Sequence, residues 1–324
     1  MMPTNASGVE LRVASRTQEA QDIVSLELVS PTGKPLPAFT AGAHIDVHVP
    51  GGPVRQYSLC NDPSDTHRYV LGILDDPASR GGSSAIHAQV HEGDLLTISE
   101  PRNNFPLVES AQHSLLLAGG IGVTPILCMA RRLSNLGRPF EMHYCTRSRA
   151  ATAFEAHIAD SHFAASVQHH FDDGAEDQLL NIPQLLASPK DGVHLYVCGP
   201  GGFMDAVLAA SREAGWPESQ LHYEFFTADV GAKDGDRGFD LVLAKTGATV
   251  TVGADETAIS ALAAAGIEVP VSCEQGVCGT CLTKVLQGEP EHRDLYLTPD
   301  EQAANDQFLP CCSRSQTPIL VVEL

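Results

Sequence analysis

The sequence is poor in positive charge. It has 20 lysine and arginine residues against 40 aspartate and glutamate residues, and its formal net charge is −20. Proteins that bind nucleic acid or anionic membranes rely on clustered cations, so we expect neither as a partner. No apolar run reaches the roughly 18 residues that a membrane helix needs, which argues against a membrane span. A protein partner with a basic docking surface fits this charge better.

The amino-terminal residues also lack the features of an export signal. Residues 1–7 have no basic cluster followed by an apolar stretch, so the cytoplasm is the expected location. Nine cysteines in a reducing compartment are interpreted as metal ligands and free thiols rather than as disulfides. With 324 residues, the chain is longer than one hydrophobic core usually supports, and we expect two or three domains.

Four of the nine cysteines have the spacing of an iron-sulfur site. Cys273, Cys278 and Cys281 form a C-x4-C-x2-C pattern, and Cys311 follows thirty positions after Cys281. Plant-type [2Fe-2S] ferredoxins use this spacing, in which four thiolates hold two irons. A structural zinc site is the alternative, but zinc modules usually contain two close pairs of ligands. The sequence therefore favours a [2Fe-2S] cluster.

Residues 1–107 are predicted to form a small antiparallel β-barrel. Short segments rich in β-branched residues are separated by Gly, Pro and Asp turns, as in small barrels. The predicted strands are Glu10–Ala14, Ile23–Val29, Ile45–Val49, Gln56–Cys60, Tyr69–Leu74 and Leu95–Glu100.

Two motifs in this region suit a phosphate group. Arg55-Gln56-Tyr57-Ser58 overlaps one predicted strand, and Arg80-Gly81-Gly82-Ser83-Ser84 leads into a helical pattern. An arginine, glycines and the first N–H groups of a helix together bind a phosphate monoester well. Each motif alone is also common in ordinary strands and turns, so their occurrence together carries the prediction.

Residues 108–228 are predicted to form an α/β domain with a parallel sheet. Ser114–Ala118 is a continuous apolar run, typical of a strand buried on both faces. It leads into Gly119-Gly120-Ile121-Gly122-Val123-Thr124-Pro125 and then a helical pattern, an arrangement that places a pyrophosphate against helix N–H groups. Pro125 stands where the dinucleotide fingerprint has its third glycine, which weakens the prediction of a dehydrogenase.

Two further strands are predicted to end at the same crevice. Phe140–Cys145 is followed by Thr146-Arg147, and His194–Cys198 by Gly199-Pro200 and a helix. Arg147 could meet an NADP 2′-phosphate or only a ribose or pyrophosphate, and Cys198 could touch the cofactor or be an ordinary buried cysteine. 

Three histidines in the same domain are a possible metal site. His162, His169 and His170 lie near one another in sequence but lack a carboxylate or cysteine at ligand spacing. They are therefore interpreted as solvated surface.

The remaining residues are predicted to form a linker and a ferredoxin domain. Residues 229–238 are polar and turn-rich, which indicates a linker, and residues 239–324 form the last domain. Gly276 and Gly279 suit the cysteine loop because glycine adopts positive φ. The predicted elements are strands Phe239–Leu243 and Thr249–Val252, a helix over Thr257–Ala265, and strands Thr283–Leu286 and Ile319–Glu323. Their order resembles the β-grasp fold of plant-type ferredoxins.

The motifs of the first two domains resemble the ferredoxin-NADP reductase superfamily, and the order of all three resembles the phthalate dioxygenase reductase family over essentially the whole chain. The resemblance implies FMN, NADH and a [2Fe-2S] cluster as cofactors. It places Arg55 on the flavin phosphate, Tyr57 on the isoalloxazine ring and Ser58 near the reactive flavin nitrogen.

The same resemblance assigns the other candidate residues. It places Cys198 beside the nicotinamide and Phe226 over the flavin face, which makes Ser58, Cys198 and Phe226 the candidate catalytic residues. It favours Cys311 over Cys312 as the fourth cluster ligand. Further cofactor contacts are assigned to Gly82, Ser83, Ser84, Gly119, Gly120, Gly122, Thr124, Pro125, Thr146, Arg147, Gly199 and Pro200.

The expected function is electron transfer. The family passes electrons from NADH through FMN and the cluster to a terminal Rieske-type oxygenase, so we expect a monomeric reductase component of an aromatic-ring oxygenase or O-demethylase system. One alternative is a reductase of free flavin, ferric chelates or a cytochrome. The other is a ferredoxin-like carrier without enzymatic activity.

Overall fold

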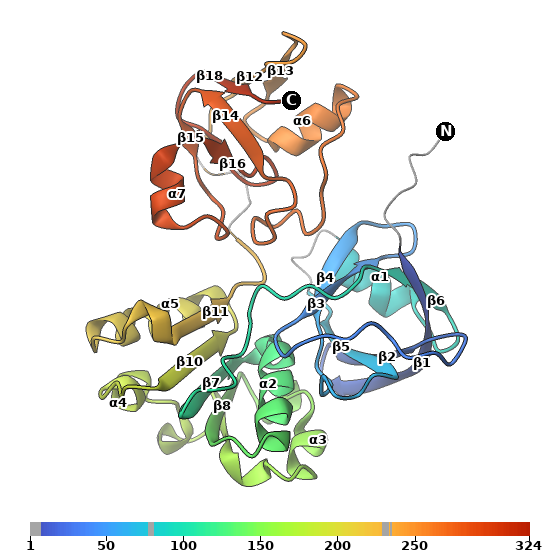
Figure 1. Cartoon of the computed structure of the whole chain (residues 1–324), viewed down its shortest axis with the longest axis vertical. Helices are drawn as coiled ribbons and strands as arrows, with labels where there is room; N and C mark the ends of the chain where they lie inside the picture. The colour runs from blue at the N-terminus through green and yellow to red at the C-terminus, as the bar shows by residue number, and fades with distance from the viewer. Residues whose placement is uncertain (1–7, 77–80, 229–232, 234) are drawn as a thin grey trace. The chain divides into compact units, whose positions relative to one another are not determined.

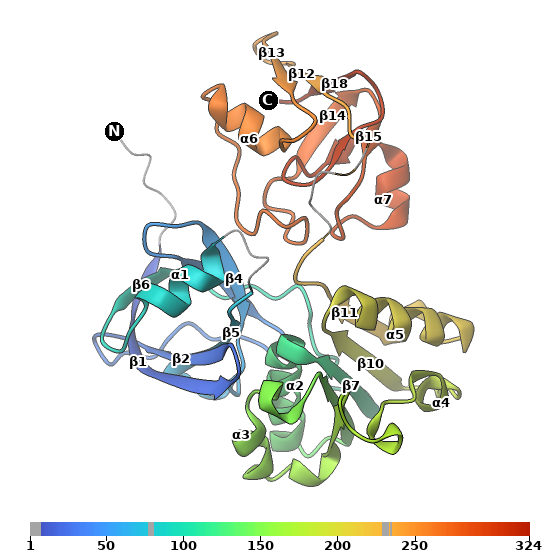
Figure 2. The same cartoon turned by 180° about the vertical axis from the view of Figure 1, so that it is seen from behind.

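The computed structural model describes residues 8–76, 81–228, 233 and 235–324. The chain divides into two compact units, Met1–Glu224 and Phe225–Leu324, drawn from two sides in Figures 1 and 2. Both nucleotide-binding regions predicted from the sequence fall in the first unit because they share contacts. The Arg131 guanidinium donates to the Cys60 carbonyl at 2.8 Å, and a Cβ on Gly72 would lie 2.7 Å from the Thr124 methyl group.

The predicted antiparallel barrel is confirmed. Its six strands are ordered β4-β3-β6-β1-β2-β5. A bridge between Leu59 and Leu71 joins the two ends of this order, which closes the sheet. Leu26, Ile45 and Leu71 are fully buried in its core. The elements are β1 (Val9–Ala20), β2 (Ile23–Val29), β3 (His44–His48), β4 (Val54–Ser58), β5 (Arg68–Leu74), α1 (Gly82–Gln89) and β6 (Leu95–Ile98).

The predicted parallel sheet is also confirmed. Five parallel strands are ordered β11-β10-β7-β8-β9, and α2 packs on β7, β8 and β10. The apolar residues Leu115, Leu116 and Leu117 of β7 are buried, as a central strand requires. The elements are β7 (His113–Gly119), α2 (Val123–Asn135), β8 (Phe140–Thr146), α3 (Glu155–Ala159), β9 (Val167–Phe171), α4 (Ile182–Leu186), β10 (Val193–Cys198), α5 (Gly201–Glu213) and β11 (Leu221–Glu224).

Strand β9 corrects the interpretation of the histidines. His162 is exposed, but His169 and His170 lie in this edge strand and are half-buried. His170 Nε2 is 2.9 Å from Nδ1 of His143 on β8, and the His169 ring stacks on Phe171. Because β9 is polar, its sequence does not indicate a strand. Its two histidines contact other aromatic rings and are not fully solvated, contrary to the prediction.

The second unit has the predicted ferredoxin elements and several that were not predicted. Its main sheet is ordered β13-β12-β18-β14-β16, and β15 and β17 form a separate ribbon. Phe239, Leu241 and Val252 face one core with Leu262 of the helix. The elements are β12 (Phe239–Leu243), β13 (Thr249–Val252), α6 (Ala258–Ala264), β14 (Thr283–Gln287), β15 (Pro290–Glu291), α7 (Pro299–Ala304), β16 (Gln307–Phe308), β17 (Arg314–Ser315) and β18 (Ile319–Val322).

None of the helices in the described residues combines the length and the apolar character that crossing a membrane requires.

Candidate functional site

The two predicted phosphate motifs meet in the structure. Arg55 lies on β4 with its side chain buried, and a Cβ on Gly82 would stand 2.7 Å from Arg55 Cγ and 2.9 Å from Nε. Gly81 has a φ of 83° and begins α1 without a side-chain cap. A buried guanidinium thus lies against an uncapped helix N-terminus, which fits a phosphate group. Arg80 lies outside the described residues.

The other candidate residues near this phosphate site differ in which groups they have available to contact a ligand. Ser58 is buried at the end of β4, and burial raises the pKa of Tyr57, so its phenol stays protonated. Ser84 Oγ donates to Asp75 at 2.6 Å, and Ser83 Oγ accepts from the Asp76 N–H at 3.3 Å. Ser83 and Ser84 therefore suit a ligand through their backbone N–H groups more than through their hydroxyls.

Two glycine turns at the carboxyl ends of β7 and β10 touch through their backbones. A Cβ on Gly122 would lie 2.2 Å from the Cys198 carbonyl oxygen. A Cβ on Gly199 would lie 2.9 Å from Gly119 Cα. Side chains are excluded at these positions, so the predicted crevice at the edge of the parallel sheet is formed by backbone.

The same edge presents two helix N-termini. Neither α2, which follows Gly122, nor α5, which follows Pro200, has a side-chain cap. Their first N–H groups and helix dipoles favour an anion such as a pyrophosphate. Gly120 has a φ of 51° and open space on its Cβ side, and Pro125 lies in the first turn of α2.

Two candidate threonines make internal hydrogen bonds. Thr124 Oγ1 donates to the Ile121 carbonyl at 3.0 Å, and its side chain is buried. Thr146 Oγ1 lies 2.8 Å from Thr152 Oγ1 and donates to the Ser148 carbonyl at 3.1 Å. Both hydroxyls stabilise their own turns. Arg147, by contrast, is exposed at the end of β8.

Glu224 is a candidate site residue that the sequence reasoning missed. It pairs in register with Cys198 across β10 and β11. Its Oε2 atom is buried without a hydrogen-bond partner among the described residues, and burial raises its pKa to about 8. Burial, with the Glu224 charge, raises the pKa of the Cys198 thiol well above its ordinary value. The raised pKa favours the protonated carboxyl at neutral pH. The sequence signal that could have identified Glu224 is its position at the carboxyl end of a parallel strand, where ligands bind in such sheets.

Glu224→Gln should change how stability depends on pH. The unfolded carboxyl ionises above pH 4.5 but the folded one only near pH 8, so the wild type loses stability as pH rises between these values. The loss approaches about 1.4 kcal/mol per pH unit. The melting temperature of the variant minus that of the wild type should therefore be larger at pH 8 than at pH 5. The exposed Glu213→Gln is the control, and an equal Glu224→Gln effect at both pH values would contradict the prediction.

The four predicted cluster ligands lie in one loop region as two pairs. The Cys273 and Cys278 sulfurs are 3.1 Å apart, and the Cys281 and Cys311 thiols hydrogen-bond to each other. A hydrogen bond with Cys273 lowers the pKa of Cys278, and hydrogen bonds with Cys281 and Cys312 lower the pKa of Cys311. Two pairs of cysteines, one for each iron, fit a [2Fe-2S] cluster. No group of three or more potential ligands surrounds a single metal position within the described ranges.

The loop glycines have the conformation that the sequence predicted. Gly276 and Gly279 have φ of 72° and 70°. A Cβ on Gly279 would overlap the Tyr296 ring, and one on Gly276 would lie 2.8 Å from Cys312 Sγ. The Gln275 N–H also donates to Cys273 Sγ at 3.2 Å. Thr280, which sequence reasoning did not select, lies 3.2 Å from Cys278 Sγ through its hydroxyl.

Phe226 is half-buried and belongs to the second unit, which begins at Phe225. Its predicted position over a flavin stays a prediction.

Comparison with known proteins gives matches over the same regions. Residues 241–316 match a family described as 2Fe-2S iron-sulfur cluster binding domain. Residues 99–221 match the N-terminal domain of a family described as dimethylamine monooxygenase subunit DmmA-like.

Relatives align over nearly the full chain. A vanillate O-demethylase oxidoreductase from Pseudomonas sp. (strain HR199 / DSM 7063) is 51% identical, covering 98% of this chain and 100% of that protein. A phthalate dioxygenase reductase from Burkholderia cepacia is 38% identical, covering 99% of both chains. A solved phthalate dioxygenase reductase structure has a TM-score of 0.82 at 37% identity, with 100% of both chains covered. The chain therefore belongs to the phthalate dioxygenase reductase family.

Proposed function

We propose that this protein is the NADH-dependent reductase component of a two-component oxygenase or O-demethylase system. The observation that carries the proposal is that one chain contains both a buried arginine against an uncapped helix N-terminus and two cysteine pairs in hydrogen-bond contact. Bound NADH would supply two electrons as hydride, the flavin would convert them into single electrons, and the cluster would carry one at a time.

The residues of the chain bind and orient these groups. Arg55 and the first N–H groups of α1 hold the FMN phosphate, with Tyr57 and Ser58 beside the ring. The N-termini of α2 and α5 hold the pyrophosphate of NADH, and the glycine turns let it approach the backbone. Cys273, Cys278, Cys281 and Cys311 hold the cluster. By the family resemblance, Phe226 would lie over the flavin face that the nicotinamide approaches.

The acceptor we propose is a terminal oxygenase of the Rieske type. Relatives carry the names vanillate O-demethylase oxidoreductase and phthalate 4,5-dioxygenase oxygenase reductase subunit. The second unit has 15 acidic against 6 basic residues, which favours a partner with a basic docking surface. We further propose a monomer in the cytoplasm, where its nine free cysteines would stay reduced.

An absorption spectrum during NADH titration tests the proposal. We expect FMN on extraction, two irons and two sulfides for each chain, and bleaching by NADH in preference to NADPH. Stopped-flow oxidation of NADH with an oxygenase, a cytochrome, ferric chelates or free flavin then separates the acceptors. Equal rates with all acceptors would contradict the proposal that an oxygenase is the specific acceptor. Purified protein without flavin would favour a ferredoxin-like carrier.

Arg55→Gln should weaken FMN binding. Loss of a charge-assisted contact to phosphate should raise the FMN dissociation constant by about 10- to 100-fold. Fluorescence titration of flavin-depleted protein measures it. Arg12→Gln, which removes an exposed arginine from the same barrel, is the control. Unchanged affinity in Arg55→Gln would place the phosphate elsewhere.

A further inference from the structure

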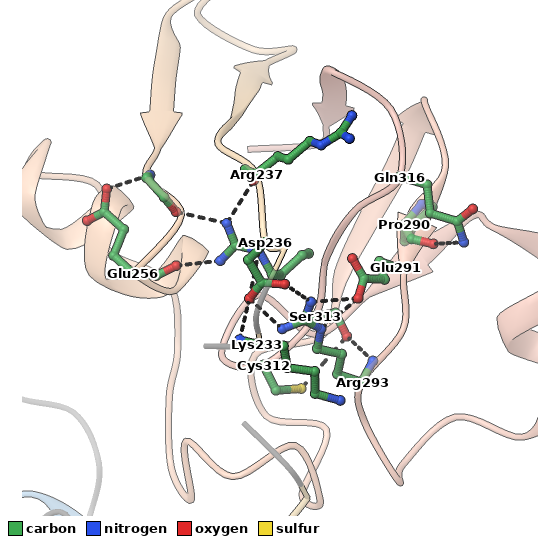
Figure 3. Close-up of polar contacts among 12 residues, drawn as sticks. Lys233, Asp236, Arg237, Glu256, Pro290, Glu291, Arg293, Cys312, Ser313 and Gln316 are labelled. Carbon is green, nitrogen blue, oxygen red and sulfur yellow. Dashed lines mark hydrogen bonds and ion pairs between the residues drawn. The ribbon is translucent and has the colours of Figure 1, made fainter. Parts of the chain in front are cut away.

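An ion network in the second unit connects the segment before β12 to the region of the fourth cysteine ligand (Figure 3). Asp236 makes a two-point ion pair with Arg293, whose Nη1 donates to Oδ2 at 2.9 Å. The Arg314 Nε lies 3.7 Å from the same carboxylate. The side chains of Asp236, Arg293 and Arg314 are 7%, 5% and 7% exposed. Asp236 is therefore a buried counter-charge shared by two buried arginines. Arg293 has a second partner, because its Nη2 donates to Glu291 Oε1 at 2.6 Å, and the Glu291 side chain is 40% exposed.

Both arginines are fixed to the turn that follows Cys311. The backbone N–H of Arg293 donates to Ser313 Oγ at 3.2 Å, and Ser313 Oγ donates to Asp294 at 3.2 Å. Arg293 and Arg314 also border the short ribbon of β15 and β17, in which Glu291 pairs with Arg314. The network thus holds the chain on the carboxyl side of the fourth ligand.

The segment around Asp236 holds Arg314 at several points. The Arg314 guanidinium donates to the carbonyls of Arg237 at 3.0 Å, Gly253 at 2.8 Å and Glu256 at 2.8 Å, and it lies over the Phe239 ring. Upstream, the Ala228 N–H donates to the Gln275 carbonyl of the cysteine loop at 2.8 Å. Ala228 therefore contacts the cysteine loop, and Asp236 and Arg237 of the predicted linker contact Arg293 and Arg314.

We propose that Asp236 is a positioning residue for the iron-sulfur site, which holds the Cys311 turn in place by neutralising Arg293 and Arg314. The proposal rests on the proposed function, because it requires that Cys311 binds a cluster. Removing one partner of a buried ion pair leaves the other charge unpaired, which is strongly destabilising. Here Arg314 would lose its carboxylate partner and Arg293 would keep only the more exposed Glu291. Both arginines lie beside the turn of a ligand, so we expect the effect to reach the metal site.

The test compares Asp236→Asn, Asp236→Glu and the exposed control Asp255→Asn in the full chain with its cofactors. We expect Asp236→Asn to release iron to a chelator about tenfold faster or more. The reduction potential of the remaining cluster should become more positive, because removing one negative charge from the network favours the more negative reduced state. Asp236→Glu should restore both properties in large part, and Asp255→Asn should match the wild type.

The double variant Asp236→Asn/Arg293→Gln keeps the test informative if the single variant does not fold. It restores the net charge of the network, so it should hold its cluster better than Asp236→Asn, and flavin content reports the integrity of the first unit. A wild-type release rate and potential in Asp236→Asn, or faster release with an unchanged potential and electron paramagnetic resonance spectrum, would overturn the positioning role. A wild type without iron and sulfide would instead refute the proposed function.

Discussion

The Cys311→Ser variant is expected to keep its flavin and lose its cluster, whereas Cys312→Ser keeps both. Cys311 is the thiol that pairs with Cys281. The Cys312 thiol hydrogen-bonds to Cys311 but not to Cys281, and its sulfur also contacts the Leu309 carbonyl and Ser313 Oγ, each at 3.7 Å, and lies against Gly276. Because a cluster needs all four ligands, we expect electron delivery to a protein acceptor to fall by about 100-fold or more in Cys311→Ser.

Iron and sulfide analysis, with the visible spectrum, measures cluster content in both variants. NADH-dependent reduction of ferricyanide is the internal control, because it needs the flavin and the nucleotide but no cluster. The ligand assignment would be reversed by a normal cluster in Cys311→Ser together with its loss in Cys312→Ser.

The Gly122→Ala variant is expected to bind flavin normally but to be reduced by NADH about 100-fold more slowly, because small misplacements of bound reactants have effects of this size. The added Cβ would lie 2.2 Å from the Cys198 carbonyl oxygen and 2.4 Å from its carbonyl carbon. Both are backbone atoms, so no side chain can move aside and the two turns must separate. The helix N-termini beside those turns would then lose their common alignment.

Stopped-flow measurement of flavin bleaching gives the rate directly. Gly202→Ala is the comparison, since its Cβ would meet no atom within 4 Å at the start of α5. It should slow bleaching far less than Gly122→Ala. A Gly122→Ala rate equal to that of the wild type would show that the turns do not need this close approach.

The elements with strong periodic signals were predictable from the sequence. The apolar run before Gly119 predicted a central parallel strand, and β12 and β13 occur with the predicted bounds. Strand β9 was missed because a strand at the sheet edge tolerates polar residues, and its sequence VQHHF has no apolar alternation. The hydrophobic pattern of a segment predicts its secondary structure only where one or both faces of the segment are buried.

The candidate site was predictable where residue type and backbone conformation determine the chemistry. The cysteine spacing and the loop glycines are of this kind. Glu224 and Asp236 were missed because their surroundings depend on distant residues. The Asp236 pair spans 57 positions to Arg293, and a turn-rich composition around it indicates a linker rather than a buried carboxylate. Thr124 and Thr146 were predicted as ligand contacts from their motifs. In the structure, however, their hydroxyls donate to carbonyls of their own turns.

The attachment of Ala228 and Asp236 to the second unit determines where the iron-sulfur domain can be excised as a separate polypeptide. The family match begins at residue 241, and the predicted linker ends at 238. A fragment that starts at either point would lack the carboxylate that neutralises Arg293 and Arg314, as well as the N–H that binds the Gln275 carbonyl. A fragment beginning at Phe225, the first residue of the second unit, retains both.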